Sequence, residues 1–258
     1  MCLLLTPPRS YHRWLDHSTM HRALLIVDPQ YDFLPPSGSL AVAHGDTILP
    51  HVYRLLDEGN WTLVVASQDL HPRSHISFAS RHGVEPFGTT TVRHPRTGEE
   101  VKQELWPDHC VEGTRGAELD EGVRARLGKW GERGTVLPKG TDRDLDAYSA
   151  FAVPLSSSTV ADRSPELSPL SQLLHEAHID TLVVCGLATD FCVRASVLAA
   201  LEAGQAARTP WKVLVVKEAV KGVHPDEEER VLSELEAAGA KVVSIAGDEL
   251  RAVWKEHT

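Results

Sequence analysis

Alternating apolar strands and amphipathic helices predict an α/β fold, with three layers (α/β/α) around a six-stranded, mainly parallel sheet. Three observations support this prediction. The candidate strands are almost unbroken apolar runs, as expected of strands that are buried on both faces. Segments with helical spacing of apolar residues stand between most of them, as in parallel crossover units. Turn-forming residues mark many of the boundaries between the two kinds of segment.

The first half of the chain supplies three of the predicted strands. Residues 23–27 form an uninterrupted apolar run, and 46–58 carries apolar residues at helical spacing before a glycine. Residues 61–67 are a second buried strand, and 135–138 are a short third one. Between these two strands, 83–104 is polar and rich in turn residues, so we expect a long excursion over the surface.

The second half repeats the pattern of strand and helix. The predicted strands are 181–185, 212–216 and 241–245. The predicted helices are 170–177, 190–203, 225–238 and a last segment that begins near 248. Proline opens the helix at 225–238 and glycine follows it, which is the usual asymmetry of helix ends. A stretch rich in serine and proline, 154–169, is expected to form a mobile loop that leads into the first of these helices.

Length and composition bound the class of protein. A chain of 258 residues can form one large α/β domain, which we expect over 21–258, after a disordered extension at 1–20. The net charge of −10 argues against nucleic acid or an anionic membrane as a partner, and no apolar run reaches the length of a membrane span. The four cysteines form no CxxC pair, which favours free thiols in the cytoplasm, with the nucleus or peroxisome left open.

Polar or reactive residues follow four of the predicted strands. They are Asp28, Asp69, Lys139 and the loop 186–192, which come from distant parts of the chain. In parallel α/β sheets, ligands bind outside the carboxyl ends of the strands. We therefore expect these residues to meet at one edge of the sheet and to form the functional site there.

Cys192 is the candidate nucleophile, because it lies just inside a predicted helix that follows a strand. Unpaired backbone N–H groups and the helix dipole lower the pKa of a thiol in such a place. The alternative is a small buried cysteine with a packing role. Asp28 would be its general base or else a cap residue, and Asp32 is expected to be structural. Lys139 would favour the thiolate, or else be an exposed lysine at a strand end.

A second group of residues has the chemistry of a metal site. Asp69 and His71 are separated by one residue, so both side chains can point to the same face of a strand. With His109 they make an Asp/His/His set that suits a divalent transition metal. His75 is either a further ligand or a hydrogen-bonding residue. A single Asp-x-His pair is weak evidence, because the chain has 14 histidines.

Six motifs of this chain together resemble those of a known protein family. They are Val27–Phe33, Ser67–Phe78, Leu105–Val111, Lys139–Arg143, Tyr148–Phe151 and Gly186–Val193. Together they resemble the motifs of the nicotinamidases, which are isochorismatase-like cysteine hydrolases with a Rossmann-like sheet topology. The resemblance spans about 22–246, and the segments Trp-Pro-x-His-Cys and Gly-Leu-Ala-Thr-Asp-Phe-Cys-Val are its most specific parts.

The resemblance implies an activity and the residues that perform it. Nicotinamide and water would become nicotinate and ammonia in NAD salvage, through a thioester on the cysteine. The implied triad is Asp28, Lys139 and Cys192, and the backbone N–H groups of Ala188 and Cys192 would form the oxyanion hole. The family also has a cis peptide bond at the position of Leu187–Ala188.

The resemblance also implies a metal and a substrate pocket. One divalent ion per subunit, usually zinc with manganese or iron as alternatives, would bind Asp69, His71 and His109, with His75 as an optional further ligand. Phe33 and Trp106 match the residues that sandwich the pyridine ring, and we expect Leu187 to contact the substrate as well.

Several alternatives stay open at this point. The nearest is an amidase of the same family that acts on another small amide or carbamoyl compound. An isochorismatase proper would need no nucleophilic cysteine, and a direct metal hydrolase would use an activated water instead. A dinucleotide-binding module would need a glycine-rich turn, whereas 186–192 offers one glycine. A homo-oligomer is also open, because the extension at 1–20 and the insertions at 83–104 and 154–169 depart from the compact family pattern.

Overall fold

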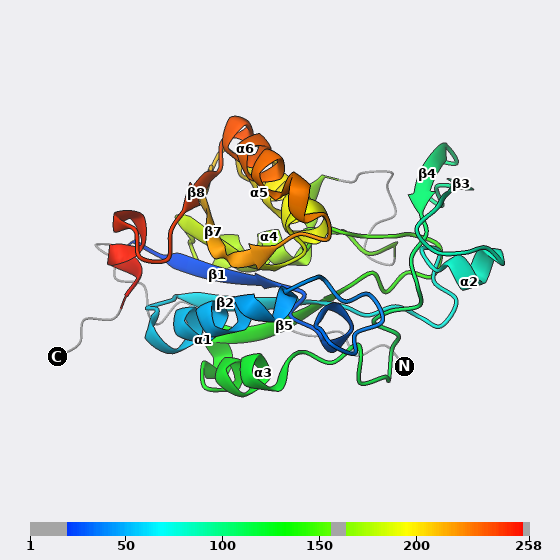
Figure 1. Ribbon diagram of the computed structural model, residues 1–258. Helices are drawn as coiled ribbons and strands as arrows, with labels where there is room; N and C mark the ends of the chain where they lie inside the picture. The colour runs from blue at the N-terminus through cyan, green and yellow to red at the C-terminus, as the bar shows by residue number, and fades with distance from the viewer. Residues whose placement is uncertain (1–19, 156–163, 255–258) are drawn as a thin grey trace.

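A six-stranded sheet forms the centre of the computed structural model, which describes residues 20–155 and 164–254 (Figure 1). Its strands are β1 (Arg22–Val27), β2 (Leu63–Asp69), β5 (Gly134–Lys139), β6 (Thr181–Leu187), β7 (Lys212–Lys221) and β8 (Lys241–Val243). They lie in the order β5-β2-β1-β6-β7-β8, and every pairing is parallel. The predicted α/β class and parallel sheet are confirmed. Residues 1–19 of the expected extension and 156–163 of the Ser/Pro-rich loop lie outside the described residues.

Helices cover both faces of the sheet, which gives the three layers seen in Figure 1. The helices α1 (Leu49–Glu58) and α3 (Glu121–Gly128) pack on one face, and α4 (Pro169–Glu176), α5 (Arg194–Ala206) and α6 (Glu228–Ala238) pack on the other. Side chains of a strand alternate between the faces, so Leu24 and Ile26 of β1 join the core under α1 while Leu25 and Val27 join the core under α5. Both faces are therefore apolar, as the continuous runs predicted.

The stretch 83–104 is more ordered than expected. It contains an antiparallel hairpin, β3 (Thr89–Arg93) paired with β4 (Glu100–Glu104), which follows the short helix α2 (Ala79–His82) and projects from the body of the molecule (Figure 1). Its strands carry threonines and charged residues and are mostly exposed or half-buried. Periodicity did not predict the hairpin, because a two-stranded sheet with little burial has no apolar face to reveal it.

Other elements differ from prediction in extent or kind. The helix α3 was missed because only Val123 and Leu127 form its buried face, although Asp120 caps it by accepting a hydrogen bond from the Val123 N–H. The predicted helix near 248 is a 3-10 helix, Asp248–Val253, and the predicted helix at 190–203 begins with a π-helical turn, Thr189–Val193. Within the described ranges, further short 3-10 helices are Tyr31–Phe33, Gly45–Ile48, Gly131–Arg133, Pro165–Leu167 and Pro225–Glu227.

Gly186 allows β1 and β6 to approach closely where the predicted site begins. It pairs with Val27, and its φ of +120° lies in the region that favours glycine. A Cβ at this position would lie 2.1 Å from the Val27 carbonyl oxygen. Any other residue here would push apart the two strands that carry Asp28 and the cysteine loop.

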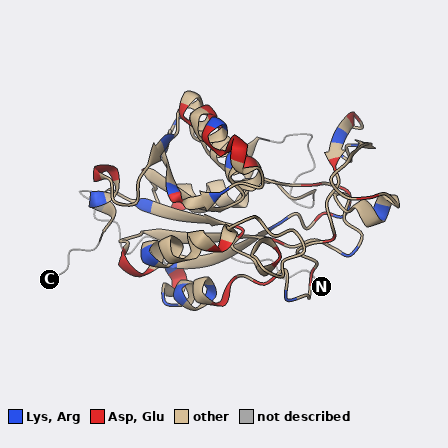
Figure 2. Ribbon diagram, in the orientation of Figure 1, with Lys and Arg blue, Asp and Glu red and all other residues tan. Residues whose placement is uncertain are grey.

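Charged residues are spread over the described part of the chain rather than collected on one element. Figure 2 shows acidic and basic positions interspersed along α6 and over the loops. Many of them pair locally, as Arg230 does with Glu227 at 2.6 Å. Among the described residues, the helices are all too short or too polar to cross a bilayer.

Candidate active site

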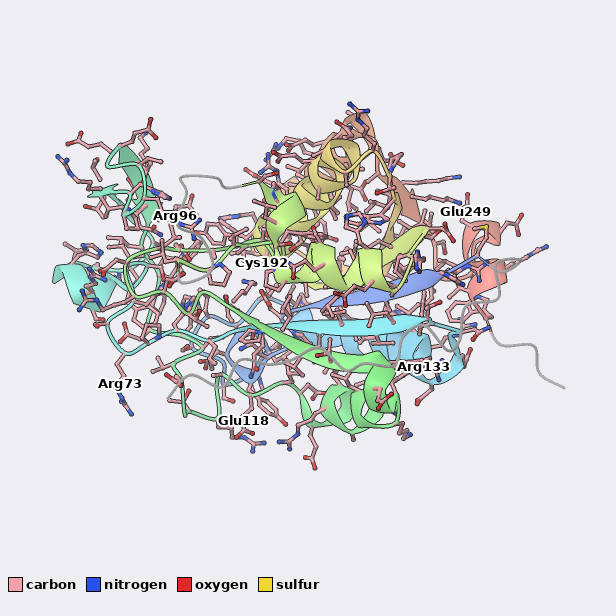
Figure 3. All side chains as sticks on the ribbon, turned by 180° about the vertical axis from the view of Figure 1, so that it is seen from behind. Arg73, Arg96, Glu118, Arg133, Cys192 and Glu249 are labelled. Carbon is pink, nitrogen blue, oxygen red and sulfur yellow. The ribbon has the colours of Figure 1, made fainter. Side chains whose placement is uncertain are left out.

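The carboxyl ends of four adjacent strands bring the predicted residues together. Asp28 follows β1, Asp69 ends β2, Lys139 ends β5, and the predicted loop 186–192 begins with the last two residues of β6. These strands are neighbours in the order β5-β2-β1-β6, and Asp69 and Lys139 pair directly across β2 and β5. In Figure 3 Cys192 lies within the molecule, whereas Arg73 extends away from it. The site is therefore buried at the edge of the sheet.

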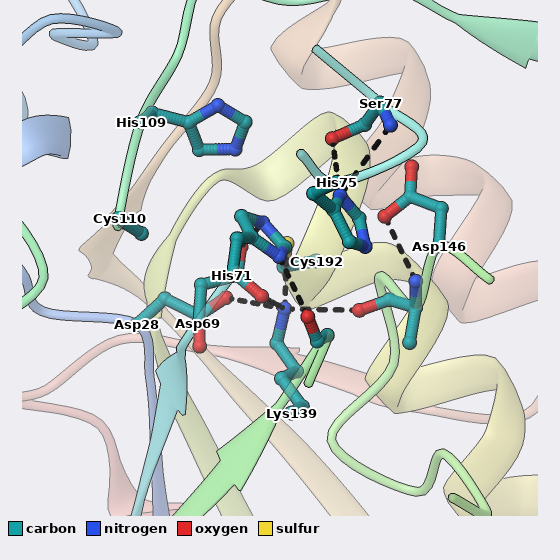
Figure 4. Close-up of polar contacts among 12 residues, drawn as sticks. Asp28, Asp69, His71, His75, Ser77, His109, Cys110, Lys139, Asp146 and Cys192 are labelled. Atoms are coloured by element: carbon teal, nitrogen blue, oxygen red, sulfur yellow. Dashed lines mark hydrogen bonds and ion pairs between the residues drawn. The ribbon is translucent and has the colours of Figure 1, made fainter. Parts of the chain in front are cut away.

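Lys139 lies at the centre of this cluster, where the dashed lines of Figure 4 converge. Its Nζ is 3.0 Å from Asp28 Oδ2, 2.6 Å from Asp69 Oδ1 and 3.4 Å from Cys192 Sγ, and it donates to the Ala147 carbonyl at 3.2 Å. Its exposed fraction is 5 %. Burial opposes the charge, but Asp28, Asp69 and Cys192 hold the pKa of Lys139 well above its ordinary value. The ammonium is thus a fixed positive charge between two carboxylates and a sulfur atom.

Asp28 is fully buried and has a fixed orientation. Ser67 donates its hydroxyl proton to Asp28 Oδ1 at 2.7 Å, and the backbone at Asp28 has a φ of 45°. Aspartate tolerates this left-handed region better than most residues do. Burial raises the pKa of the carboxyl group, against the opposing effect of Lys139. A carboxylate of raised basicity beside a thiol is suited to accept its proton.

Cys192 differs from expectation in its acidity. It lies in the π-helical turn, and its exposed fraction is 6 %. We expected the helix dipole to lower the pKa of the thiol, but burial raises that pKa well above its ordinary value, and Lys139 offsets only part of this effect. That expectation is wrong, because desolvation of the thiolate outweighs the nearby positive charge. The resting sulfur is a thiol and needs a base, and its Sγ lies within 4.8 Å of a carboxylate oxygen of Asp28.

Asp69, His71 and His109 form a group that can hold a metal ion. One ligand atom from each lies within 4.8 Å of the others, and all three side chains are buried. The Nδ1 of His71 donates to the Gly140 carbonyl at 2.8 Å, and the Nδ1 of His109 donates to the Pro107 carbonyl at 2.8 Å. In the neutral ring these bonds keep the proton on Nδ1 and leave Nε2 as the available ligand atom. Burial opposes protonation, but Asp69, whose Oδ2 lies 3.5 Å from His71 Nε2, raises the pKa of His71, so metal binding there would compete with a proton. The donor set and its orientation fit a divalent transition metal.

His75 is held beside this group by other partners. Its ring stacks on His71 with centroids 4.0 Å apart. Its Nδ1 lies 2.7 Å from Ser77 Oγ and its Nε2 lies 3.3 Å from the Leu145 carbonyl oxygen. Burial and the neighbouring His71 lower the pKa of His75 to about 4, so the ring is neutral. Of the two roles considered for it, the structure shows the hydrogen-bonding one.

The predicted pocket residues lie beside this cluster. Phe33 lies 5.7 Å from the His109 ring, between centroids, and Trp106 packs edge-on against Phe191 at 5.0 Å. Both are almost fully buried. Leu187 is buried too, and the peptide bond between it and Ala188 is cis. Asp32 is bound to structural partners instead, accepting hydrogen bonds from the N–H groups of Cys110 at 2.7 Å and Ser39 at 3.3 Å.

Gln30 is a residue of the site that sequence reasoning did not single out. Its amide spans the end of β2: Nε2 donates to the Asp69 carbonyl at 2.7 Å, and Oε1 accepts from the Asp69 N–H at 2.7 Å. Nε2 also donates to the Ala117 carbonyl at 2.9 Å. The only hint in the sequence is its place two residues after a strand-end aspartate, which is weak. Gln30 fixes the backbone from which the potential metal ligands project.

Replacing Gln30 by alanine is expected to destabilise the protein by about 2–4 kcal/mol, because the buried N–H and carbonyl groups of Asp69 would lose their side-chain partner and the Ala117 carbonyl would lose one of two donors. Urea unfolding measures this change. Gln68→Ala is the matched control, since among the described residues its side chain donates to Ala117 alone, and it should cost about 1 kcal/mol. Equal losses in the two variants would show that the bonds to Asp69 are unimportant.

Comparison with known proteins shows which family has this sequence and fold. A family model described as the isochorismatase domain matches residues 157–247. Nicotinamidase of Escherichia coli is 37 % identical over 229 residues, which cover 87 % of this chain and 95 % of the relative. Nicotinamidase of Saccharomyces cerevisiae is 31 % identical over 86 % of this chain and 99 % of its own length.

Solved structures agree with the sequence relatives. The structure of the yeast nicotinamidase has a TM-score of 0.74 at 29 % identity, covering 86 % of this chain and 99 % of that one. A pyrazinamidase of Pyrococcus horikoshii, solved in complex with zinc, has a TM-score of 0.60 at 31 % identity, covering 87 % and 99 %. The three-layer fold and the cluster at its strand ends define a hydrolase of the isochorismatase type. Within that class, the chain belongs to the nicotinamidase family.

Proposed function

We propose that this protein hydrolyses nicotinamide to nicotinate and ammonia, with Cys192 as the nucleophile. The observation that carries the proposal is the position of Lys139 Nζ, 3.0 Å from the Asp28 carboxylate and 3.4 Å from Cys192 Sγ. The relatives named nicotinamidase support the reaction, and the three buried, free thiols at Cys110, Cys185 and Cys192 suit a reducing compartment such as the cytoplasm.

In the first half of the reaction, Asp28 takes the thiol proton and Cys192 Sγ attacks the carboxamide carbon. The N–H groups of Ala188 and Cys192 hold the oxyanion, each contributing about 3 kcal/mol when well aimed. Asp28 then gives its proton to the departing nitrogen, the C–N bond breaks, and ammonia leaves. A nicotinoyl thioester remains on Cys192. The raised pKa of Asp28 lets the carboxyl group hold this proton between the two steps.

In the second half, water replaces ammonia. Asp28 accepts a proton from the water as its oxygen attacks the thioester carbonyl carbon, and the C–S bond breaks to release nicotinate. The proton returns to the sulfur and the site is reset. Lys139 transfers no proton in this scheme. Its ammonium stabilises the negative charge as that charge moves between Asp28 and Cys192.

In this proposal the role of the metal is to bind and orient the pyridine ring of the substrate. Asp69, His71 and His109 would hold a divalent ion, for which we propose zinc, with manganese or iron as alternatives. Such an ion would bind the pyridine nitrogen and orient the ring, which is the templating role of metals. Phe33 and Trp106 flank the ring in this proposal, and Leu187 borders it. The zinc complex of the Pyrococcus horikoshii relative supports the choice of metal.

His71→Ala is expected to lower bound metal well below one ion per chain and to raise the KM for nicotinamide, because one of the three ligands is lost. Metal content by mass spectrometry and steady-state kinetics measure the two effects. His175→Ala, on α4 at the opposite end of the strands, is the control and should retain its metal. Full metal occupancy in the His71 variant would contradict the assigned ligand set.

Ammonia release from purified protein tests the function directly. Nicotinamide should be hydrolysed fastest, with pyrazinamide and a carbamoyl compound as comparison substrates. Preference for the carbamoyl compound would instead support an amidase of the same family with another substrate. Iodoacetamide should inactivate the enzyme, since it alkylates the nucleophile. Survival of activity after alkylation of Cys192 would favour a metal-activated water.

A further inference from the structure

The hairpin β3–β4 reaches the substrate pocket through its last residues. Glu104 ends β4, and Trp106 follows two positions later. Figure 1 shows the hairpin projecting from the end of the molecule at which the carboxyl ends of the strands lie. Nothing in the reaction described above uses this hairpin. Its contacts with the pocket show what it contributes.

A short chain of hydrogen bonds links Glu104 to the indole of Trp106. The Nε1–H of Trp106 donates to the Tyr148 hydroxyl oxygen at 3.0 Å, and the Tyr148 hydroxyl donates to Glu104 Oε2 at 3.3 Å. The direction is fixed, because an indole N–H can only donate and an ionised carboxylate can only accept. Burial, with the nearby Asp146, raises the pKa of Tyr148, so the hydroxyl keeps the proton it donates.

A second bond ties the same two segments together. Gln103, the preceding residue of β4, is buried, and its Nε2 donates to Asp146 Oδ2 at 2.7 Å. The hairpin is therefore anchored at two neighbouring positions to the loop that carries Asp146 and Tyr148. Of these two bonds, the one from Tyr148 to Glu104 continues to the proposed ring-binding residue.

The indole of Trp106 also packs against the π-helical turn that carries Cys192. Trp106 and Phe191 are perpendicular, with ring centroids 5.0 Å apart, and Tyr148 contacts Phe191 at 5.7 Å. Phe191 directly precedes Cys192. The rotation of the indole is thus set by packing on one side and by the hydrogen-bond chain on the other.

We propose that Glu104 is a positioning residue that fixes the ring-binding face of Trp106 through Tyr148, and so sets the affinity for the pyridine ring. The inference rests on the proposed function and deepens it. Glu104 touches none of the reacting atoms. Its loss should therefore weaken substrate binding and leave the chemical steps intact.

Three variants of β4 test the proposal. Glu104→Ala should raise the KM for nicotinamide about three- to ten-fold, with kcat nearly unchanged, because one hydrogen bond to a charged acceptor is lost at an exposed position. Glu104→Gln keeps a carbonyl acceptor and should restore most of the affinity. Glu100→Ala, at the other end of the same strand and also exposed, is the matched control and should behave as wild type.

A binding measurement separates this inference from the function itself. Calorimetry with nicotinamide on Cys192→Ala, alone and combined with Glu104→Ala, should show the same three- to ten-fold loss of affinity. Tyr148→Phe, which keeps the ring and removes the hydroxyl, provides a second test if the glutamate variant folds poorly, and it should also raise KM.

The outcomes are distinct. An unchanged KM in both Glu104→Ala and Tyr148→Phe would overturn the inference, and so would a fall in kcat at constant KM or an equal effect in Glu100→Ala. Failure of wild-type protein to release ammonia from nicotinamide, with nicotinamide still bound and the affinity still dependent on Glu104, would overturn the proposed function alone.

Discussion

Cys192→Ala is expected to abolish turnover of nicotinamide, lowering kcat at least about 10⁴-fold. The alanine removes the atom that forms the thioester, and no other thiol contacts Lys139 in the described part of the chain. Binding of nicotinamide should persist, because the proposed ring contacts and metal ligands are untouched. Nicotinate production by chromatography measures the first effect, and calorimetry measures the second.

The control for this variant is Cys185→Ala. Cys185 is also a buried free thiol, but it lies within β6, where its thiol donates to the Leu25 carbonyl at 3.7 Å. Its loss should lower stability slightly and leave kcat near wild type. In the wild-type enzyme, mass spectrometry after acid quenching should detect a nicotinoyl group on Cys192. Turnover by Cys192→Ala, or acylation at another residue, would refute the covalent mechanism.

Asp28→Asn is expected to have the second largest effect, lowering kcat by about 10²- to 10⁴-fold. The amide has nearly the shape of the carboxylate but cannot accept the thiol proton. Since burial already keeps the thiol pKa high, the sulfur would stay protonated and unreactive. Lys139 would keep its ion pair with Asp69, so we expect the variant to fold.

Asp32→Asn separates this role from a general need for acidic residues. Asp32 lies in the same motif, yet its oxygens accept backbone N–H groups of Cys110 and Ser39. The amide can satisfy only one of them well, so stability should fall by about 1–2 kcal/mol while turnover per folded molecule remains. Comparable losses of kcat in Asp28→Asn and Asp32→Asn would remove the case for Asp28 as the base.

Sequence reasoning was most successful where burial imposes a pattern. The parallel strands were predictable because both of their faces are covered, so β1 and β6 appear as apolar runs in the sequence. The rule that ligands bind at the carboxyl ends of such strands then selected Asp28, Asp69 and Lys139, which the structure brings together.

The remaining features depend on tertiary contacts that have no local pattern. The hairpin β3–β4 is polar on nearly every side, and α3 has a buried face of only two residues. Gln30 matters because of where its amide lies, not because of its neighbours in the chain. The thiol pKa was predicted in the wrong direction because the depth of burial of Cys192 can be seen only in three dimensions.

The double pairing of Lys139 has a consequence for how this enzyme can change over time. One ammonium forms ion pairs with both a carboxylate of the proposed catalytic triad and a carboxylate of the candidate metal group. Replacing Asp69 by a neutral residue, to remove metal binding, would leave the Lys139 ammonium paired with Asp28 and Cys192 alone. The electrostatic environment of these two catalytic groups would then change as well. A lineage or a designer seeking a metal-free amidase on this scaffold must therefore redesign both functions together, since neither can drift independently of the other.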